Sequence, residues 1–337
     1  MRKNRKTFLV TGGTGFIGSN ICQLLVNANH SVKIFDNNSR GSISKIKRIK
    51  RKVKFIKGDI RNKESLKKAL KNTDAVIHLA YINGTKYFYS NPVLILDIAI
   101  KGILNIIEAC IKNRVKELYL ASSSEVYQTP LKIPTDEQEP LKIPDIFNPR
   151  YSYGGGKILT ELMGVHYGKK YFKKLIIFRP HNVYGPDMGS DHVIPEFIKR
   201  FKTLKSKKFR IQGTGNEIRS FIYIEDFIDA FKLILKRGKH LNIYNIGTSE
   251  KIKIKELAFR LSRIFKKKII LKKTPLARGG TKVRIPDINK IKKLGFKSKF
   301  SLDKGLKKIL LNQTLWLFIN FEGAFCCPTQ MSLYQKI

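Results

Sequence analysis

Residues 7–18 read TFLVTGGTGFIG, and this stretch decides the fold. Its first five residues, Thr7–Thr11, form a short apolar run typical of a buried strand, and Gly15–Asn27 has the apolar spacing of a helix. Strand and helix patterns then alternate along the first half of the chain. Further strands are predicted over Ser31–Asp36, Val53–Ile56, Ala75–Ala80, Glu117–Ser122 and Lys174–Arg179, and further helices over Pro92–Lys112 and Tyr153–Tyr171. We therefore expect an α/β protein with a doubly wound parallel sheet, a Rossmann fold.

The turn between the first strand and the first helix carries three glycines at GxxGxxG spacing. Gly12 permits a tight turn, Gly15 lets the backbone approach a pyrophosphate, and Gly18 lets the helix pack closely on the sheet. The free N–H groups and the positive dipole end of the helix favour a phosphate at this point. We therefore predict a dinucleotide site that also includes Phe16 and Ile17.

The strand–helix rhythm breaks after Arg179, and the sequence becomes rich in Pro, Gly and polar residues. We assign residues 1–180, with later returns near 219–247, to a dinucleotide-binding Rossmann domain. Residues 181–310 are assigned mainly to a smaller substrate-binding lobe. In this part we expect helices near Pro195–Thr203 and over Lys255–Phe265, and strands over Phe221–Ile224 and Ile243–Ile246.

The segment 311–337 differs in composition, with the stretch LWLFINFEGAF, the single Trp and two adjacent Cys. Two interpretations are open, a hydrophobic docking segment and non-native sequence from a shifted or extended reading frame. We favour the second and assign this atypical tail no function.

Composition excludes several classes of protein. The 337 residues are 42% hydrophobic, ample for a core, and the four Cys form no CxxC pair, so neither a disulfide scaffold nor a metal site is expected. No apolar run is long enough for a membrane span. The net charge of +42 comes mostly from lysine dispersed along the chain, which indicates compositional bias on solvated faces rather than a nucleic-acid surface. We expect a cytoplasmic protein with free thiols.

An acidic residue ends the second predicted strand, 18 residues after the last glycine of the turn. The Asp36 carboxylate can accept both hydroxyls of an adenosine ribose and would repel a 2′-phosphate, so NAD is favoured over NADP. Asp59 and Ile60 follow the third strand, where Asp59 could meet the adenine amino group or be an ordinary loop residue. Leu79 and Ala80 follow the fourth strand and complete the predicted cofactor site.

Tyr153 and Lys157 form a YxxxK motif, which places phenol and ammonium on one face of a helix. A cation beside a tyrosine favours the phenolate, so Lys157 should lower the pKa of Tyr153 and could also hold the nicotinamide ribose. Ser123, Ser124 and Glu125 lie at the carboxyl end of the fifth strand, where ligands bind in open α/β sheets. The serine hydroxyls could bond a sugar oxygen and Glu125 could take a proton from carbon. The alternatives are a strand-end cap and a surface charge.

Together these motifs resemble the extended short-chain dehydrogenase/reductase family, in its nucleotide-sugar epimerase and dehydratase branch. The resemblance covers about residues 7–310 and includes the segments HLA (78–80), RPHNVYGP (179–186), RSFIYIED (219–226), NIG (245–247) and RIPD (284–287). Three residues depart from the usual pattern. They are Ala99 where Asn is common, Gly156 where Ser or Ala is usual, and Gln128 where Gly is usual.

The resemblance implies roles for particular residues. Tyr153 would be the general base, Lys157 its partner and Ser123 the catalytic hydroxyl. Substrate contacts would come from Ser124, from Asn182, and from Arg219 and Arg284 as arginines that hold the diphosphate. The resemblance also implies NAD as cofactor, a nucleoside-diphosphate sugar as substrate, and a homodimer formed through the helices Pro92–Lys112 and Tyr153–Tyr171.

The shared chemistry of such enzymes begins with oxidation of the sugar, most often at C4. We favour a 4-epimerase, in which hydride returns to the opposite face of the 4-keto sugar. A 4,6-dehydratase and a UDP-glucuronate decarboxylase, with Glu125 as the base at C5, remain as alternatives. A more remote alternative is a non-catalytic RNA-binding or scaffold module, which the net charge of +42 would suit.

Overall fold

The computed structural model describes residues 5–321, and of residues 312–321 the backbone alone. A seven-stranded parallel sheet with the order β11-β6-β5-β4-β1-β2-β3 forms its centre. The strands are β1 (Thr7–Thr11), β2 (Ser31–Asp36), β3 (Val53–Lys57), β4 (Ala75–His78), β5 (Glu117–Ala121), β6 (Lys174–Pro180) and β11 (Asn242–Ile246). The strand order reverses between β1 and β4, and this switch point is where open α/β sheets bind ligands. The predicted doubly wound parallel sheet is confirmed.

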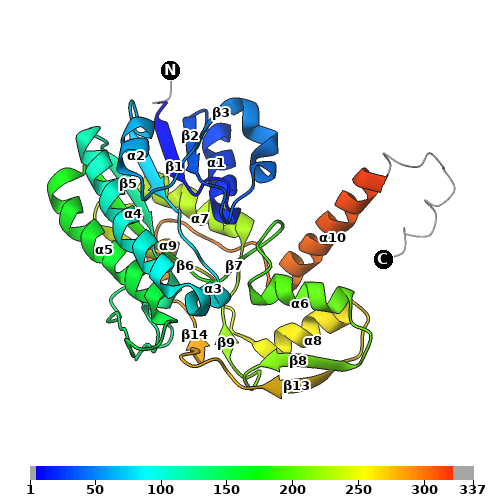
Figure 1. Ribbon diagram of the computed structural model, residues 1–337. Helices are drawn as coiled ribbons and strands as arrows, with labels where there is room; N and C mark the ends of the chain where they lie inside the picture. Colours follow the sequence, from blue (N-terminus) through cyan, green and yellow to red (C-terminus); the bar gives the residue numbers. More distant parts are fainter. Residues whose placement is uncertain (1–4, 322–337) are drawn as a thin grey trace.

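Helices cover both faces of the sheet (Figure 1). Alternate residues of β1 enter two separate cores, since Phe8 and Val10 pack on one face of the sheet and Leu9 packs on the other. This alternation follows from the two-residue period of a strand. The helices of the first face are α1 (Phe16–Asn27) and α7 (Ile224–Arg237), and those of the second are α2 (Lys63–Ala69), α4 (Pro92–Lys112) and α5 (Tyr151–Tyr171).

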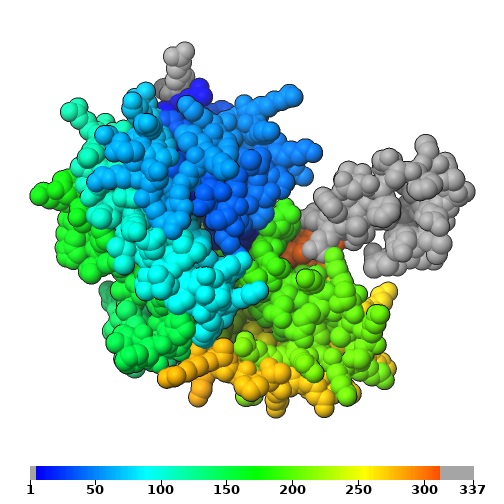
Figure 2. All heavy atoms as spheres, viewed as in Figure 1, coloured from blue at the N-terminus to red at the C-terminus, as the bar shows by residue number. Residues whose placement is uncertain are grey.

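A smaller lobe lies beside the carboxyl ends of the strands. In Figure 2 it is coloured green to orange and lies below the blue to cyan N-terminal half. It contains α6 (Val193–Lys202), α8 (Ile254–Ile264), the parallel pair β8 (Lys208–Gln212) and β13 (Ile270–Thr274), and a sheet of β12 (Ile252–Lys253), β9 (Ile218–Arg219) and β14 (Val283–Arg284). The other elements are η1 (Ile43–Lys52), α3 (Thr85–Ser90), η2 (Ser124–Val126), β7 (Val183–Tyr184), β10 (Ile222–Tyr223), α9 (Asn289–Lys292) and α10 (Leu302–Phe321).

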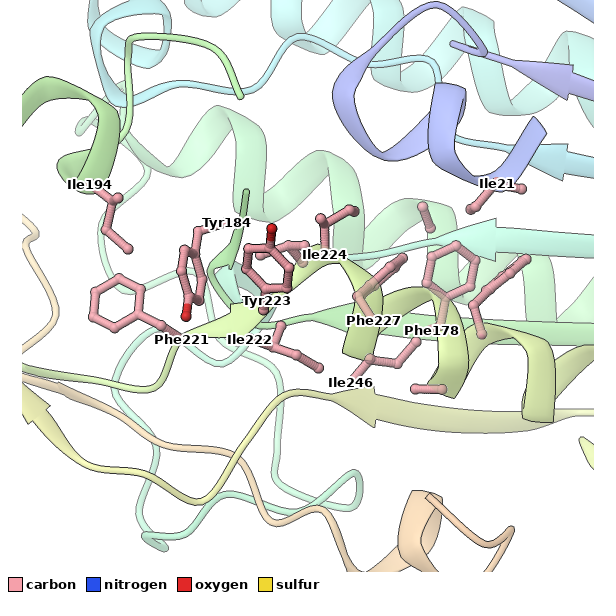
Figure 3. Packing of buried hydrophobic residues seen from close by; sticks show 14 of the residues in the cluster. Ile21, Phe178, Tyr184, Ile194, Phe221, Ile222, Tyr223, Ile224, Phe227 and Ile246 are labelled. Carbon is pink, nitrogen blue, oxygen red and sulfur yellow. The ribbon is translucent and has the colours of Figure 1, made fainter. Parts of the chain in front are cut away.

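One apolar core joins the lobe to the sheet. Figure 3 shows Tyr184, Phe221 and Tyr223 between Ile194 of α6 and Phe227 of α7. Tyr184 meets both Phe221 and Tyr223 edge-on. Because these aromatic contacts are buried, they fix the lobe against the carboxyl ends of the strands.

Five of the α-helices in the described residues were not foreseen from the sequence, namely α2, α3, α7, α9 and α10. The expected strand at Phe221–Ile224 is only the two-residue β10, and α7 begins at once at Ile224. The proposed tail boundary at residue 311 falls inside α10, which runs on to Phe321, while residues 322–337 lie outside the described residues. Across residues 5–321, no helix has both the length and the apolar character needed to cross a membrane.

Candidate active site

One cavity of about 1190 Å³ opens at the carboxyl ends of the sheet strands and extends into the smaller lobe. Typical pockets for one small ligand measure about 300–1,000 Å³, so this cavity has room for two ligands. Every residue predicted to bind or react lines it. These residues are Gly12, Gly15, Phe16, Ile17, Gly18, Asp36, Asp59, Ile60, Leu79, Ala80, Ser123, Ser124, Glu125, Tyr153, Lys157, Asn182, Arg219 and Arg284.

The glycine turn has the close contacts that its spacing predicts. Gly12 has a φ of +71°, and a Cβ there would lie 2.8 Å from the backbone N of Ala80. A Cβ on Gly18 would lie 2.1 Å from the carbonyl O of Gly12. No side chain caps the start of α1, and Gly15, Phe16, Ile17 and Gly18 at this helix end line the cavity. This is the geometry of a phosphate site.

Two aspartates lie on the same side of the cavity. Asp36 ends β2, is buried, and accepts the backbone N–H of Thr14 at 3.0 Å and of Asn38 at 2.8 Å. Asp59 accepts hydrogen bonds from Arg61, which also bonds Asp97 at 2.9 Å. The Arg61 hydrogen bonds outweigh burial and hold the pKa of Asp59 at about 2. Asp59 is therefore firmly ionised, and its partner Arg61 was not predicted from the sequence.

The YxxxK pair lies on α5, but its members do not interact as expected. Lys157 Nζ donates to the carbonyl O of Ala121 at 2.8 Å and lies 3.9 Å from the Tyr81 ring centroid, against 5.9 Å for the Tyr153 ring. Burial raises the pKa of Tyr153, and the hydrogen bond with Ser123 only partly offsets it. The expectation that Lys157 lowers the pKa of Tyr153 is wrong for this arrangement, because burial dominates. Burial also lowers the pKa of Lys157 to about 7.

The fifth strand leads into the short helix η2, which begins at Ser124. Ser123 Oγ accepts the Glu125 N–H at 3.2 Å, so the expected alternative of a strand-end cap applies to this serine, which also lines the cavity. Glu125 is no surface charge, since its carboxylate lies 2.6 Å from Arg284 and 3.5 Å from Arg150. Burial raises the pKa of Glu125, but these two guanidinium charges outweigh it and hold the pKa at about 2.

Two further predicted substrate residues, Arg219 and Asn182, donate hydrogen bonds to backbone carbonyls. Arg219 donates to the carbonyl O of Thr281 at 2.7 Å and of Ile218 at 2.9 Å. Burial and the neighbouring Arg284 charge lower the pKa of Arg219 to about 9. Asn182 has a φ of +41° and donates to the carbonyl O of Ser220 at 2.8 Å. Its left-handed backbone holds the amide at the cavity wall.

Arg150 and Tyr81 are among the cavity residues that sequence reasoning missed. Arg150 immediately precedes α5, is buried, and its Nε has no hydrogen-bond partner within residues 5–311. Its position three residues before the YxxxK tyrosine was the available signal. Tyr81 follows the HLA segment and touches both Tyr153 and Lys157. No spacing rule marks it, because these contacts join β4 to α5 only in the folded protein.

A family model, described as the NAD dependent epimerase/dehydratase family, matches residues 8–247. The chain belongs to this family. A family relative from Methanocaldococcus jannaschii, provisionally named a UDP-glucose 4-epimerase, is 34% identical over 90% of this chain and 96% of its own. A UDP-N-acetyl-alpha-D-glucosaminuronate decarboxylase from Bacillus cytotoxicus is 29% identical over 91% of this chain and 97% of its own. Some relatives are longer, and the chain spans 46% of a trifunctional Arabidopsis thaliana enzyme.

Solved structures of this family share the fold. The UDP-glucose 4-epimerase of Thermotoga maritima, crystallised with UDP-glucose, superimposes with a TM-score of 0.81 at 29% identity. The alignment covers 92% of this chain and 99% of that one. As a member of this family, the chain is an NAD-dependent enzyme.

The residues present fit NAD. A Cβ on Gly18 would fill the turn, so the glycine cradle has the shape that a pyrophosphate needs. The buried carboxylate of Asp36 lies at the end of β2, where a carboxylate accepts the ribose hydroxyls. Among the residues that the structure describes, no group of three or more His, Cys, Asp or Glu side chains could hold a metal ion.

Proposed function

We propose that the chain is a nucleotide-sugar 4-epimerase. The observation that carries this proposal is that Tyr153, Lys157 and Ser123 line the same cavity as the glycine turn, while Glu125 is held ionised between two arginines. The relative from Methanocaldococcus jannaschii and the Thermotoga maritima structure, both named as UDP-glucose 4-epimerases, support it.

When bound, NAD supplies a reversible hydride acceptor. In this proposal Tyr153 takes the proton of the sugar C4 hydroxyl as hydride leaves that carbon, and returns a proton after the 4-keto sugar has turned over. Ser123 bonds both the sugar oxygen and Tyr153. Because burial keeps Tyr153 protonated in the structure, the phenolate would form only once the ligands have bound, with Lys157 still at the Ala121 carbonyl.

The other groups of the cavity would bind and orient the two ligands. Asp36 accepts the adenosine ribose hydroxyls, with Asp59, Ile60, Leu79 and Ala80 along the cofactor. Arg219 and Arg284 would hold the diphosphate, since a guanidinium can bond two phosphate oxygens at once. Ser124 and Asn182 would contact the sugar or its diphosphate.

The dehydratase alternative needs a base at C5, and Glu125 is poorly suited to that step. A carboxylate with a pKa of about 2 binds a proton weakly at neutral pH. Its two arginines favour a second candidate instead, a uronate decarboxylase. Arg150 and Arg284 converge on one carboxylate, and the unpartnered Nε of Arg150 could bond a carboxylate on the sugar.

We also propose a homodimer in the cytoplasm. Val93, Leu96 and Ile100 are exposed along one face of α4, and Leu162 is exposed on the neighbouring α5. A contiguous apolar stripe of this kind is typical of an interface. For the domains, we propose residues 1–180, with returns near 219–247, as the part that binds NAD, and residues 181–310 mainly as the substrate lobe.

The experiment is incubation of the purified protein with NAD+ and UDP-, dTDP-, GDP- or CDP-hexoses, or with UDP-glucuronate. Product mass and proton NMR then separate the candidates. Inversion at one carbon with unchanged mass supports the epimerase. Loss of CO2 from UDP-glucuronate supports the decarboxylase, and loss of water from a hexose supports the dehydratase.

A further inference from the structure

Tyr81 contacts both Tyr153 and Lys157, although it lies outside the YxxxK motif and outside the helix α5 that carries it. It follows β4, and its ring centroid lies 3.9 Å from Lys157 Nζ. The same ring meets the Tyr153 ring edge-on, with centroids 5.1 Å apart and planes at 87°. Phe88 stacks on Tyr153 at 4.7 Å. Tyr153 is therefore fixed by two aromatic rings, and Lys157 is covered by one of them.

The hydroxyl of Tyr81 shows how this ring is seated. It is buried and has no hydrogen-bond partner within residues 5–311. A Cβ on Gly156 would lie 2.2 Å from this hydroxyl and 2.6 Å from the Cβ of Ala99. The hydroxyl thus occupies space between α4 and α5 that two small residues leave open.

These small residues are two of the three departures from the family pattern, Ala99 where Asn is common and Gly156 where Ser or Ala is usual. A single larger side chain at Gly156 would collide with Tyr81. The Tyr81 hydroxyl makes no hydrogen bond in the space beside Gly156 and Ala99. What this space provides is therefore the position of the Tyr81 ring. The position of the Tyr81 ring therefore depends on the small side chains at Ala99 and Gly156.

The charge environment of Lys157 explains what the ring does there. Lys157 is buried, donates to the Ala121 carbonyl, and lies one helical turn before Glu161, whose charge partly offsets the burial. From β4 it faces His78, which burial keeps neutral. The aromatic faces of Tyr81 and Tyr153 complete its surroundings. An aromatic face stabilises an ammonium group more strongly when that group is buried than when it is exposed to water.

We propose that Tyr81 is a positioning residue of the active site, whose ring holds the Lys157 ammonium at the Ala121 carbonyl and fixes the Tyr153 ring, and that Ala99 and Gly156 are small because they seat it. This inference rests on the proposed function for the roles of Tyr153 and Lys157. Tyr81 touches no reacting atom and acts through its two neighbours.

The first test compares Tyr81→Leu, which loses the aromatic face, with Tyr81→Phe, which keeps it. The readout is NADH affinity between pH 5.5 and 9, followed by nicotinamide fluorescence, with Lys157→Met as the variant without the titrating group. We expect Tyr81→Leu to move the Lys157-dependent transition by about one pH unit toward acid, and Tyr81→Phe to leave it in place. A transition that is the same in Tyr81→Leu and in the wild type overturns the proposal.

This readout needs no turnover, so it tests Tyr81 even if none of the nucleotide sugars is a substrate. Where one is turned over, the alkaline limb of the kcat profile should shift with the NADH transition in Tyr81→Leu. A lower kcat with an unmoved profile would mark a merely structural role and would also count against the proposal.

The second test addresses the space that Gly156 and Ala99 leave for the Tyr81 hydroxyl. Gly156→Ala is combined with Ala99→Gly, so that the new methyl group meets the Tyr81 hydroxyl and not the Ala99 side chain. We expect at least a tenfold loss of NADH affinity, and recovery to within threefold of the wild type when Tyr81→Phe is added. The nearest ring carbon then lies 3.5 Å from the methyl group, an ordinary contact. Absence of the loss, or a loss that Tyr81→Phe does not repair, overturns the assigned seat.

Discussion

Glu161 on α5 and Arg179 on β6 form a buried ion pair. Arg179 donates from Nε and Nη2 to the two carboxylate oxygens of Glu161 at 2.8 and 2.6 Å, and the side chains are 2% and 5% exposed. Ser122 donates to the same carboxylate, and Arg179 also donates to Tyr127 at 2.6 Å. We predict that Glu161→Gln strongly destabilises the protein, because it leaves the guanidinium charge buried without a counterion.

The size of the effect follows from this burial. Removing one partner of a buried pair costs about 3–5 kcal/mol of the free energy of unfolding. A chain of this size loses about 1.4 °C of Tm per kcal/mol, so we expect Tm to fall by about 4–7 °C. The matched control is Glu225→Gln. Glu225 pairs with Lys308 at 2.7 Å, but the two side chains are 52% and 42% exposed. An exposed pair contributes about 0–1 kcal/mol, so this change should lower Tm by no more than about 2 °C.

The assay is thermal unfolding followed by circular dichroism, with denaturant titration of the same variants. Replacing both partners, as in Glu161→Leu with Arg179→Met, should recover part of the lost stability, because no buried charge remains. Equal Tm values for Glu161→Gln and Glu225→Gln would refute the reasoning, since they would show that Arg179 does not depend on Glu161 for its charge balance.

Four further predictions concern the cavity. Tyr153→Phe should lower kcat by about 10²–10⁴-fold in the turnover assay and leave NADH affinity, read by fluorescence, within a few-fold of the wild type. Gly18→Ala should abolish NAD binding in calorimetry, because its Cβ would lie 2.1 Å from the Gly12 carbonyl O. Asp36→Ala should weaken NAD binding about 10–100-fold and NADP binding less, since hydrogen bonds to a charged group contribute about 1.5–3 kcal/mol and the repulsion of a 2′-phosphate is also lost. Burial holds the pKa of Lys157 at about 7 against its usual 10.5, so the unfolded chain binds more protons between these values and the free energy of unfolding should rise with pH across this window. Denaturant titrations at pH 7 and 9.5 should show that the rise is smaller in Lys157→Met.

The fold was largely predictable, because its signals are local. The apolar runs of the sheet strands and the spacing of α4 mark those elements within a few residues of their observed ends. The helix α7 was missed because β10 passes into it at Ile224 without a turn residue between them. Its apolar residues Ile224, Phe227, Phe231 and Ile234 have helical spacing, so the signal was present but the preceding strand obscured it.

The sequence predicted which residues line the cavity, but not which of these residues bond one another. Residues at the ends of parallel strands must gather at one edge of the sheet, and the cavity lining shows that they do. The partner of a charge depends on the folded chain. Glu125 bonds Arg284, 159 residues away, and Lys157 bonds a backbone carbonyl rather than the neighbouring Tyr153. No spacing rule carries such information, since these contacts arise only when distant segments pack together.

The pairing of Glu125 also links the two candidate activities. A diphosphate and the Glu125 carboxylate are both anions, and in the proposed site both use the guanidinium of Arg284. A ligand that draws Arg284 away removes one of the charges that hold the pKa of Glu125 at about 2, so this pKa rises toward the range of a useful base. A diphosphate that binds Arg284 without breaking its bond to Glu125 keeps Glu125 inert and leaves proton transfer to Tyr153. The position of Arg284 in the substrate complex therefore decides whether Glu125 takes part in the reaction.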